Sequence, residues 1–157
     1  MSTITVREAT EVDRDSIAVV TESALAALRR IYRPNQRAIA HKRKIAESLT
    51  QLVALVGERI VGTVQYKVES DRLHFLSLSV HADFRRQGVA RTLVASLARI
   101  GAALGARRLT LHTIKQTGNS ETFEKLGFRV VSEERAIHFE SDVFDRLTEV
   151  YMERLIE

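Results

Sequence analysis

Residues 79–90 combine side chains and backbone features that can hold a phosphate. Their sequence, Ser-Val-His-Ala-Asp-Phe-Arg-Arg-Gln-Gly-Val-Ala, leaves a strand, makes a short turn and enters a helix from about Arg91. The first amides of a helix have no partner inside it, and the helix dipole makes this end positive. Gly88 lets a ligand approach the backbone, while Arg85 and Arg86 add charge. The segment predicts a phosphate or pyrophosphate site, and the alternative is a generic strand-to-helix connection with surface arginines.

A second informative segment lies at residues 119–128, Asn-Ser-Glu-Thr-Phe-Glu-Lys-Leu-Gly-Phe. It predicts a short helix that ends at Gly127. Asn119 is a good N-cap for this helix, and Glu121 stands in the first turn, where the helix dipole favours an acid. Residues 151–155, Tyr-Met-Glu-Arg-Leu, fit a closing strand.

Together these segments resemble the GNAT superfamily of N-acetyltransferases. The pyrophosphate loop of that family follows the pattern Gln/Arg-x-x-Gly-x-Gly/Ala, which Arg85, Gly88 and Ala90 fill at the right spacing. Residues 119–128 are similar to its second signature, Asn-x-x-x-Tyr-Glu-Lys-Leu-Gly-Phe, and the C-terminal strand to its last one. Both motifs occur at the correct separation, and the expected order of elements matches over almost the whole chain. The resemblance implies a single domain of this family over residues 1–157.

The resemblance implies that the chain binds acetyl-CoA, releases CoA and uses no metal. The main-chain amides that would hold the CoA pyrophosphate are those of Arg86, Gln87, Gly88, Val89 and Ala90, in a loop that Arg85 shapes. In this fold the strand before the loop splays from its neighbour, and the pantetheine arm pairs with exposed main chain, here at Leu78, Ser79 and Val80. The Val80 amide would then polarise the thioester carbonyl and stabilise the oxyanion. Asn119 aligns with an asparagine that contacts the cofactor arm, so contact and capping both remain open.

Phe123 departs from the family pattern. The resemblance places it beside the cofactor, where many members carry a tyrosine that protonates the leaving thiolate. Phenylalanine has no proton to give, so the acid is water, another side chain, or unnecessary, because CoA thiolate is a reasonable leaving group.

A base is needed as well, because an amine is protonated at neutral pH and must lose a proton before it attacks. In some members this base is a glutamate eleven positions ahead of the first loop residue, and that offset reaches His74 here. Histidine titrates near neutral pH and can serve directly or through water. The alternative, which the usual roles of histidine favour, is a partly buried strand histidine bonded to backbone. Weaker candidates for the base are His112, Glu69 and Glu133.

Three functions follow from these observations. The leading one is an N-acetyltransferase that moves an acetyl group from acetyl-CoA to a primary amine of a small molecule or protein, by direct transfer in a ternary complex. The second is a non-catalytic acyl-CoA-binding or sensing module, which Phe123 and the uncertain base motivate. The third is nucleic-acid binding through the basic residues 29–44, which we disfavour because the run lacks the series of interleaved aromatic side chains that forms a stacking platform. Members of the family often dimerise, which implies a homodimer.

Composition restricts the class of protein. The chain has 157 residues, 45% of them hydrophobic, and a net charge of +4 with a pI of about 9.8. It contains no cysteine, which excludes disulfides and cysteine nucleophiles. We find neither a signal peptide nor an apolar stretch long enough to span a bilayer. We therefore expect a cytoplasmic protein with no membrane association.

Apolar periodicity predicts the elements that must position these residues. A first helix should run from the caps Thr10 or Asp13 to the break at Pro34, and a second over about 36–50, with Ile39, Ile45 and Leu49 inward. Further helices should occupy 91–104 and 119–126, and residues 142–147 a turn or helix. Strands are expected near 4–7, 51–57, 60–68, 72–80, 108–113, 128–131 and 148–156. The order β-α-α-β-β-β-α-β-α-β-β predicts an α/β fold with one mixed sheet of about six to seven strands and helices on both faces.

Overall fold

The chain is built on a seven-stranded mixed sheet with strand order β1-β3-β4-β5-β6-β9-β7. The computed structural model describes residues 3–39 and 48–156. All neighbouring strands are antiparallel except β5 and β6, which are parallel. The strands are β1 (Ile4–Glu8), β3 (Thr50–Val56), β4 (Arg59–Glu69), β5 (Arg72–Val80), β6 (Arg108–Ile114), β7 (Arg129–Arg135) and β9 (Thr148–Leu155).

In the described residues the sheet is accompanied by the α-helices α1 (Arg14–Leu25), α3 (Val89–Ala103) and α4 (Asn119–Lys125). Short 3-10 turns are η1 (Glu11–Asp13), η2 (Leu28–Arg30), η4 (Ala82–Phe84) and η5 (Lys115–Thr117), and β2 (Arg33–Pro34) pairs with β8 (Phe139–Glu140). None of the helices in the described residues is long and apolar enough to cross a membrane.

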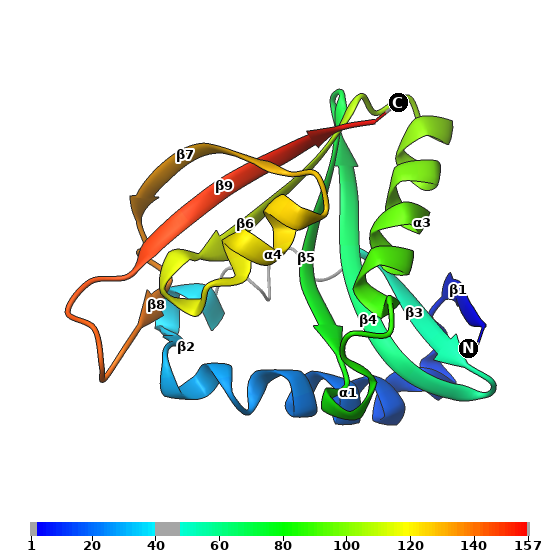
Figure 1. The fold of residues 1–157 in the computed structure, drawn as a ribbon, viewed down its shortest axis with the longest axis horizontal. Coiled ribbons are helices and arrows are strands. Elements are labelled where there is room, and N and C mark those ends of the chain that lie inside the picture. The colour runs from blue at the N-terminus through cyan, green and yellow to red at the C-terminus, as the bar shows by residue number, and fades with distance from the viewer. Residues whose placement is uncertain (1–2, 40–47, 157) are drawn as a thin grey trace.

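The alternation of β3 shows how two helices cover opposite faces. Leu52 and Ala54 join the main core with Leu93 and Leu97 of α3. Val53, between them, belongs to a second cluster with Val20 of α1. Because successive strand residues point to opposite faces, α3 lies on one face of the sheet and α1 on the other. Phe123 of α4 packs on the same cluster as α3. Figure 1 shows α3 and α4 in front of the strands and α1 along the lower end.

The sheet divides into two halves between β5 and β6. These strands pair only over Arg72–Arg108, Leu73–Leu109 and His74–Thr110. Beyond this point β5 stays with β4, and β6 stays with β9 to its end at Ile114. The two strands therefore separate toward the C-terminal end of β5, as Figure 1 shows. We call the space between β5 and β6 beyond His74 the splay.

The predicted order of elements, the α/β class and the mixed sheet are confirmed. Some bounds were wrong. The first helix ends at Leu25 and continues only as the turn η2, and α3 begins at Val89 rather than near Arg91. Residues 36–39 are helical, but Ile39 is 51% exposed rather than inward.

Other differences concern segments that only long-range pairing reveals. Residues 142–147 contain bends and no helix, and the β2–β8 pair was not expected. The pair is built on Tyr32 and Phe139, whose rings meet edge to face at 5.1 Å. Most of the rest of the predicted helix over 36–50, with Ile45, lies outside the described residues.

Candidate functional site

The loop between β5 and α3 presents unpaired amides at the first turn of α3. Gly88 is the N-cap of α3 in a left-handed conformation (φ 86°), with no side-chain cap. The first helical amides also lack an acceptor within the helix. Arg86 is left-handed too, with φ 61°. Turns of this kind gather N–H groups into a concavity that suits an anion. Residues 85–88 are exposed, whereas Val89 is buried, so the loop faces outward and the helix start is anchored.

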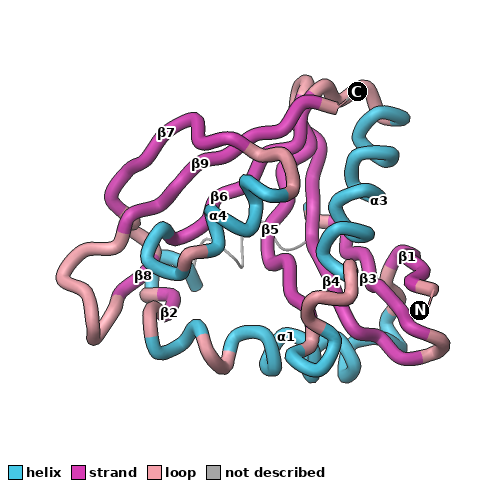
Figure 2. Tube along the Cα trace, viewed as in Figure 1, coloured by secondary structure: helices cyan, strands magenta, loops and turns pink. Residues whose placement is uncertain are grey.

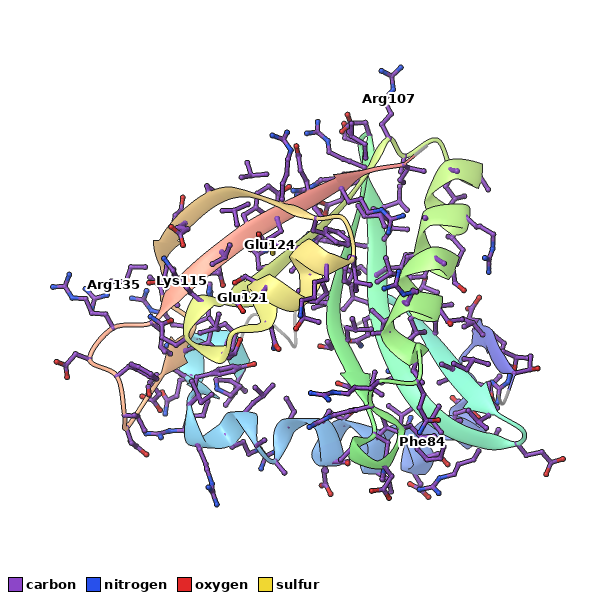
Figure 3. All side chains as sticks on the ribbon, in the orientation of Figure 1. Phe84, Arg107, Lys115, Glu121, Glu124 and Arg135 are labelled. Atoms are coloured by element: carbon purple, nitrogen blue, oxygen red, sulfur yellow. The ribbon has the colours of Figure 1, made fainter. Side chains whose placement is uncertain are left out.

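The loop is held in place from two sides. The Ala82 N–H donates to the Ser23 hydroxyl of α1 at 3.0 Å. On the other side, the guanidinium of Arg59 lies 4.9 Å from the centre of the Phe84 ring, which directly precedes the loop. Figure 2 shows this connection beside α1, and Figure 3 places Phe84 at that end of the molecule, opposite Arg107. The strand, turn and helix thus follow the predicted order, and ligand binding stays a prediction.

Gly62 of β4 lets the start of α3 lie close to the sheet, and sequence reasoning missed it. A Cβ built on Gly62 would lie 2.6 Å from Cγ1 of Val89 and 3.3 Å from the carbonyl oxygen of Ser79. A side chain there would push away the first residue of α3, and with it the amides of the loop. A lone glycine in a strand pattern is the signal that could have pointed to such a close approach.

The main chain of Val80 faces the splay. The His81 N–H donates to the Val61 carbonyl of β4 at 2.8 Å, so these residues form a hydrogen-bonded pair. The neighbouring pair, Val80 and Gly62, is then of the non-hydrogen-bonded kind, and the Val80 N–H and C=O point away from β4. By the same alternation the main chain of Ser79 points to β4. Of these two residues, Val80 is therefore the one free to meet a ligand in the splay.

A β-bulge interrupts β5 just before this point. The register shifts between Thr63 and Gln65, which pair with Ser79 and Leu76. One residue more therefore lies on β5 than on β4, and Ser77 takes a left-handed φ of 56°. A bulge takes main-chain groups out of the regular ladder. The bulge therefore leaves main-chain groups around Leu78 free of the ladder. The family resemblance had assigned Leu78 to the cofactor arm, and the bulge gives a structural reason why its backbone is accessible.

His74 and Val80 lie far apart along β5. Five ladder positions separate their partners Lys67 and Gly62, which corresponds to roughly 17 Å along the strand. Leu78 lies nearer to His74, at roughly 10 Å by the same spacing. Direct proton transfer between His74 and an amine at Val80 is therefore excluded, and any transfer at Leu78 needs water between them.

Phe123 packs into an aromatic cluster on the α3 face. Its ring centre lies 6.1 Å from that of Phe75 and 5.8 Å from that of Phe128. Phe75 is buried on β5, directly after the last residue that pairs with β6. The Phe123 ring is therefore partly buried against the main core.

Asn119 is the first residue of α4, and Gly118 is the N-cap. The Asn119 side chain makes no cap bond, and its own N–H instead donates to the Thr117 hydroxyl at 3.2 Å. The capping role that the sequence left open is therefore wrong, because the preceding turn, Lys115–Thr117, supplies the cap acceptor. Contact with a cofactor stays a prediction.

His74 is half-buried and bonded to a side chain rather than to backbone. Its Nδ1 lies 2.8 Å from the hydroxyl oxygen of Thr110, its partner on β6. Burial, followed by the nearby His112, Arg72 and Lys67, lowers the pKa of His74 to about 4. The ring is therefore neutral at pH 7, is a weaker base than an exposed histidine, and lies at the closed end of the splay.

The other proposed bases are in less suitable positions. Glu69 is paired with Lys67 at 2.8 Å and Arg72 at 3.5 Å, and Glu133 with Lys115 at 2.9 Å. His112 is exposed and lies beside His74. Across the described residues, no group of three or more histidine, aspartate or glutamate side chains is arranged to hold a metal ion.

Part of the basic stretch at residues 29–44 is neutralised. Arg33 binds Glu140 at 3.0 Å and Asp142 at 2.8 Å, which joins β2 to β8. Arg29, Arg30 and Arg37 are exposed, and the lysines and arginine at 42–44 lie outside the described residues. Within the described part of this stretch, Arg33 therefore has a structural role in holding β2 to β8.

Two surface cavities lie away from the loop and the splay. One of about 460 Å³ is lined by residues of α3 and β9, among them Ala98 and Arg154. The other, of about 370 Å³, lies between Glu8, Arg14 and Thr50. Neither contains a residue proposed for the site, so the site rests on strand and loop geometry.

A model of the acetyltransferase (GNAT) family matches residues 19–128. Among solved structures, the ribosomal-protein-S18-alanine N-acetyltransferase of Escherichia coli is 18% identical with a TM-score of 0.76, over 99% of this chain and 95% of that chain. A ribosomal-protein-alanine N-acetyltransferase of Brucella melitensis is 18% identical with a TM-score of 0.71, over 96% and 99%. A GCN5-related N-acetyltransferase of Kribbella flavida is 16% identical with a TM-score of 0.74, over 97% of both chains. These likenesses support the fold alone. Among proteins with curated functions, none matches significantly.

Proposed function

The chain belongs to the acetyltransferase (GNAT) family of acyltransferases, and on that premise we propose that it moves an acetyl group from acetyl-CoA to a primary amine. Transfer is direct, within a ternary complex, because the chain has no cysteine to carry the acyl group. The observation that carries the proposal is that the splay and the first turn of α3 are joined by one continuous stretch of chain. The splay between β5 and β6 leads along β5, through η4, to the amides at the start of α3.

The residues present fit acetyl-CoA. A Cβ built on Gly88 meets no described atom within 4 Å, so the backbone there is open to a pyrophosphate. Arg85, Arg86 and Arg91 are exposed and add positive charge around it. Bound acetyl-CoA supplies the activated acetyl group as a thioester. The loop amides then hold its phosphates, and the Val80 main chain pairs with its pantetheine arm.

We place the thioester carbonyl beside Leu78 rather than Val80. The bulge frees main chain at Leu78, and this position brings the reacting carbon nearer to His74. An N–H donor aimed at the carbonyl oxygen stabilises the negative charge that develops there. His74 accepts the amine proton through water. No side chain is assigned to protonate the thiolate, because Phe123 has no acidic hydrogen.

The acceptor is a small-molecule or protein amine. Two of the fold relatives are named as N-acetyltransferases of a ribosomal-protein alanine, which is one kind of protein amine. We place the entry of the acceptor on the face of the sheet that carries His74 and α1.

We further propose a homodimer, because every residue of the edge strand β7 is exposed and an edge strand can pair with another chain. Light scattering, which measures the mass in solution, tests this proposal.

Two measurements test the proposed function. Calorimetry on cofactor-free protein should detect acetyl-CoA, and pooled primary amines should then release free CoA. Phe123 favours one other function, a non-catalytic acyl-CoA sensor. Binding without CoA release across a broad amine pool would support the sensor, and lack of binding would remove both.

We expect Asn119→Ala to weaken acetyl-CoA binding while leaving the melting temperature unchanged. A true N-cap residue would cost about 1 kcal/mol on replacement by alanine, but Gly118 occupies that position. Calorimetric affinity and thermal unfolding measure the two effects separately. Normal affinity in Asn119→Ala would remove Asn119 from the cofactor site.

We expect Phe123→Tyr to retain or raise turnover modestly. General acid catalysis contributes about 10²–10⁴-fold where a proton is needed, and thiolate departure needs little help. The ring packs against Phe75 and Phe128, so a hydroxyl buried without a partner would instead lower stability by roughly 1–3 kcal/mol. Steady-state kinetics and thermal unfolding on the same preparation distinguish the two. An inactive wild type that Phe123→Tyr activates would favour the sensor.

A further inference from the structure

Three rings form a row across β5, β6 and β9. His74 and His112 lie with ring centres 5.1 Å apart at an angle of 60°. Tyr151 packs on His112 at 4.9 Å. Thr110 pairs with His74, and His112 pairs with Tyr151, so all four side chains point to one face of the sheet. This row begins at the closed end of the splay.

The hydrogen bonds leave one nitrogen of His74 available. Nδ1 is engaged by the hydroxyl of Thr110, which is fully buried. In the tautomer in which Nδ1–H donates to the Thr110 hydroxyl, the free lone pair lies on Nε2, and Nε2 is then the nitrogen that accepts a proton. Solvent access increases along the row, from half-buried His74 to exposed His112. Tyr151 is fixed by Arg72, whose Nη1 donates to the phenol oxygen at 2.7 Å.

Charged groups face this row from every neighbouring strand. They are Lys67 and Glu69 on β4, Arg72 on β5, Glu149 on β9 and Glu134 on β7. A proton on His74 is unfavourable because the ring is half-buried and lies near Arg72 and Lys67. The pKa of His112 is lowered too, because its ring packs against His74 and Tyr151 and loses part of its hydration there, and Glu149 opposes this shift. Both rings are neutral at pH 7, and because a lowered pKa makes each ring a weaker base, a proton on either ring is held only briefly before it is passed on.

We propose that His112 takes over the amine proton from His74 and releases it to solvent, so that the two histidines form a relay out of the splay. The proposal rests on the proposed acetyl transfer. The N–H bond of the protonated amine breaks as an O–H bond forms on the water beside it, and a proton passes through water to Nε2 of His74. The N–H bond on Nε2 then breaks as one forms on His112. Water then takes the proton, and both rings return to their starting state.

His112 does not touch the substrate in this proposal. It acts only through His74, by removing the proton that His74 has accepted. A centroid separation of 5.1 Å leaves the two rings close enough for one water molecule to bridge a nitrogen of each. Without His112, a proton on half-buried His74 has no neighbouring ring to receive it. Turnover should then depend on an external base.

The test compares His112→Gln with Tyr151→Phe. His112→Gln keeps a polar side chain that does not titrate, and Tyr151→Phe keeps the packed ring and removes only the hydroxyl. We expect kcat to fall about tenfold in His112→Gln, with the KM for acetyl-CoA unchanged, and added imidazole to restore much of the loss. Tyr151→Phe should stay within about twofold of wild type.

A ligand-free readout accompanies the kinetics. NMR titration of His74 should give a midpoint well below 6.5, and in His112→Gln it should rise because one source of positive charge is removed. An unchanged kcat in His112→Gln, a loss that imidazole does not restore, or an unmoved His74 midpoint would each overturn the relay. Wild type without acetyl transfer would overturn the proposed function and the relay together, whereas the other outcomes overturn the relay alone.

Discussion

Gly88→Asp should lower the affinity for acetyl-CoA by about 100-fold. The carboxylate would stand at the N-cap of α3, beside the amides proposed to hold the pyrophosphate. Like charges about 5 Å apart repel by roughly 3 kcal/mol at an effective dielectric constant of 20, and each 1.4 kcal/mol is tenfold in affinity. Calorimetric titration of the folded variant with acetyl-CoA measures the loss.

The matched control is Gly88→Asn, which has nearly the same shape and no charge. A Cβ at this position meets no described atom, and both side chains tolerate positive φ better than most, so both variants should fold. Asparagine should weaken binding less than aspartate. Equal, small losses in the two variants would mean that the loop does not hold the pyrophosphate.

Glu153→Leu should lower the free energy of unfolding by about 1–2 kcal/mol, which is about 2–8 °C in melting temperature, because both arginine partners stay partly solvated when the carboxylate is removed. Glu153 is only 6% exposed on β9 and binds Arg108 of β6, with 3.2 Å between the charged atoms, and Arg129 of β7. Arg108 also binds Asp71 at 3.1 Å, in the turn before β5. This network closes the end of the sheet where β5 and β6 still pair. Thermal and urea unfolding measure the loss, and a wild-type melting curve would show that the network contributes nothing.

Glu153→Gln isolates the charge in this network and gives a pH signature. Burial raises the pKa of Glu153, but its bonds and charge interactions with Arg129 and Arg108 outweigh burial and lower it from 4.5. A group with a lowered native pKa stabilises the fold above its unfolded pKa, and this is lost as the pH falls through the native value. Wild type should therefore exceed Glu153→Gln in stability at pH 7, and the difference should shrink below about pH 4.5. A difference that is constant down to acid pH would contradict the ionic role.

Features that depend on residues close together in the chain could be predicted from the sequence. Apolar periodicity and glycine punctuation were enough to order the strands and helices, because side-chain spacing within one element reflects its own geometry. The loop at residues 85–88 was also readable, since a strand end, a glycine and a helix start lie within a few positions. The family motifs share this local character, which is why they predicted the α/β sheet and the cofactor segment together.

Features that depend on which strands pair, and in what register, could not be predicted and are visible only in the folded chain. The bulge at Ser77 is a mismatch between β4 and β5, and the approach of Gly62 to Val89 needs α3 to be placed. Asn119 looked like a cap until the turn before it positioned Gly118 there. His74 was proposed from its offset to the loop, but its partner His112 lies 38 positions away and becomes a neighbour only because β5 and β6 run in parallel. Proton transfer between side chains depends on such contacts, and no pattern within one segment contains them.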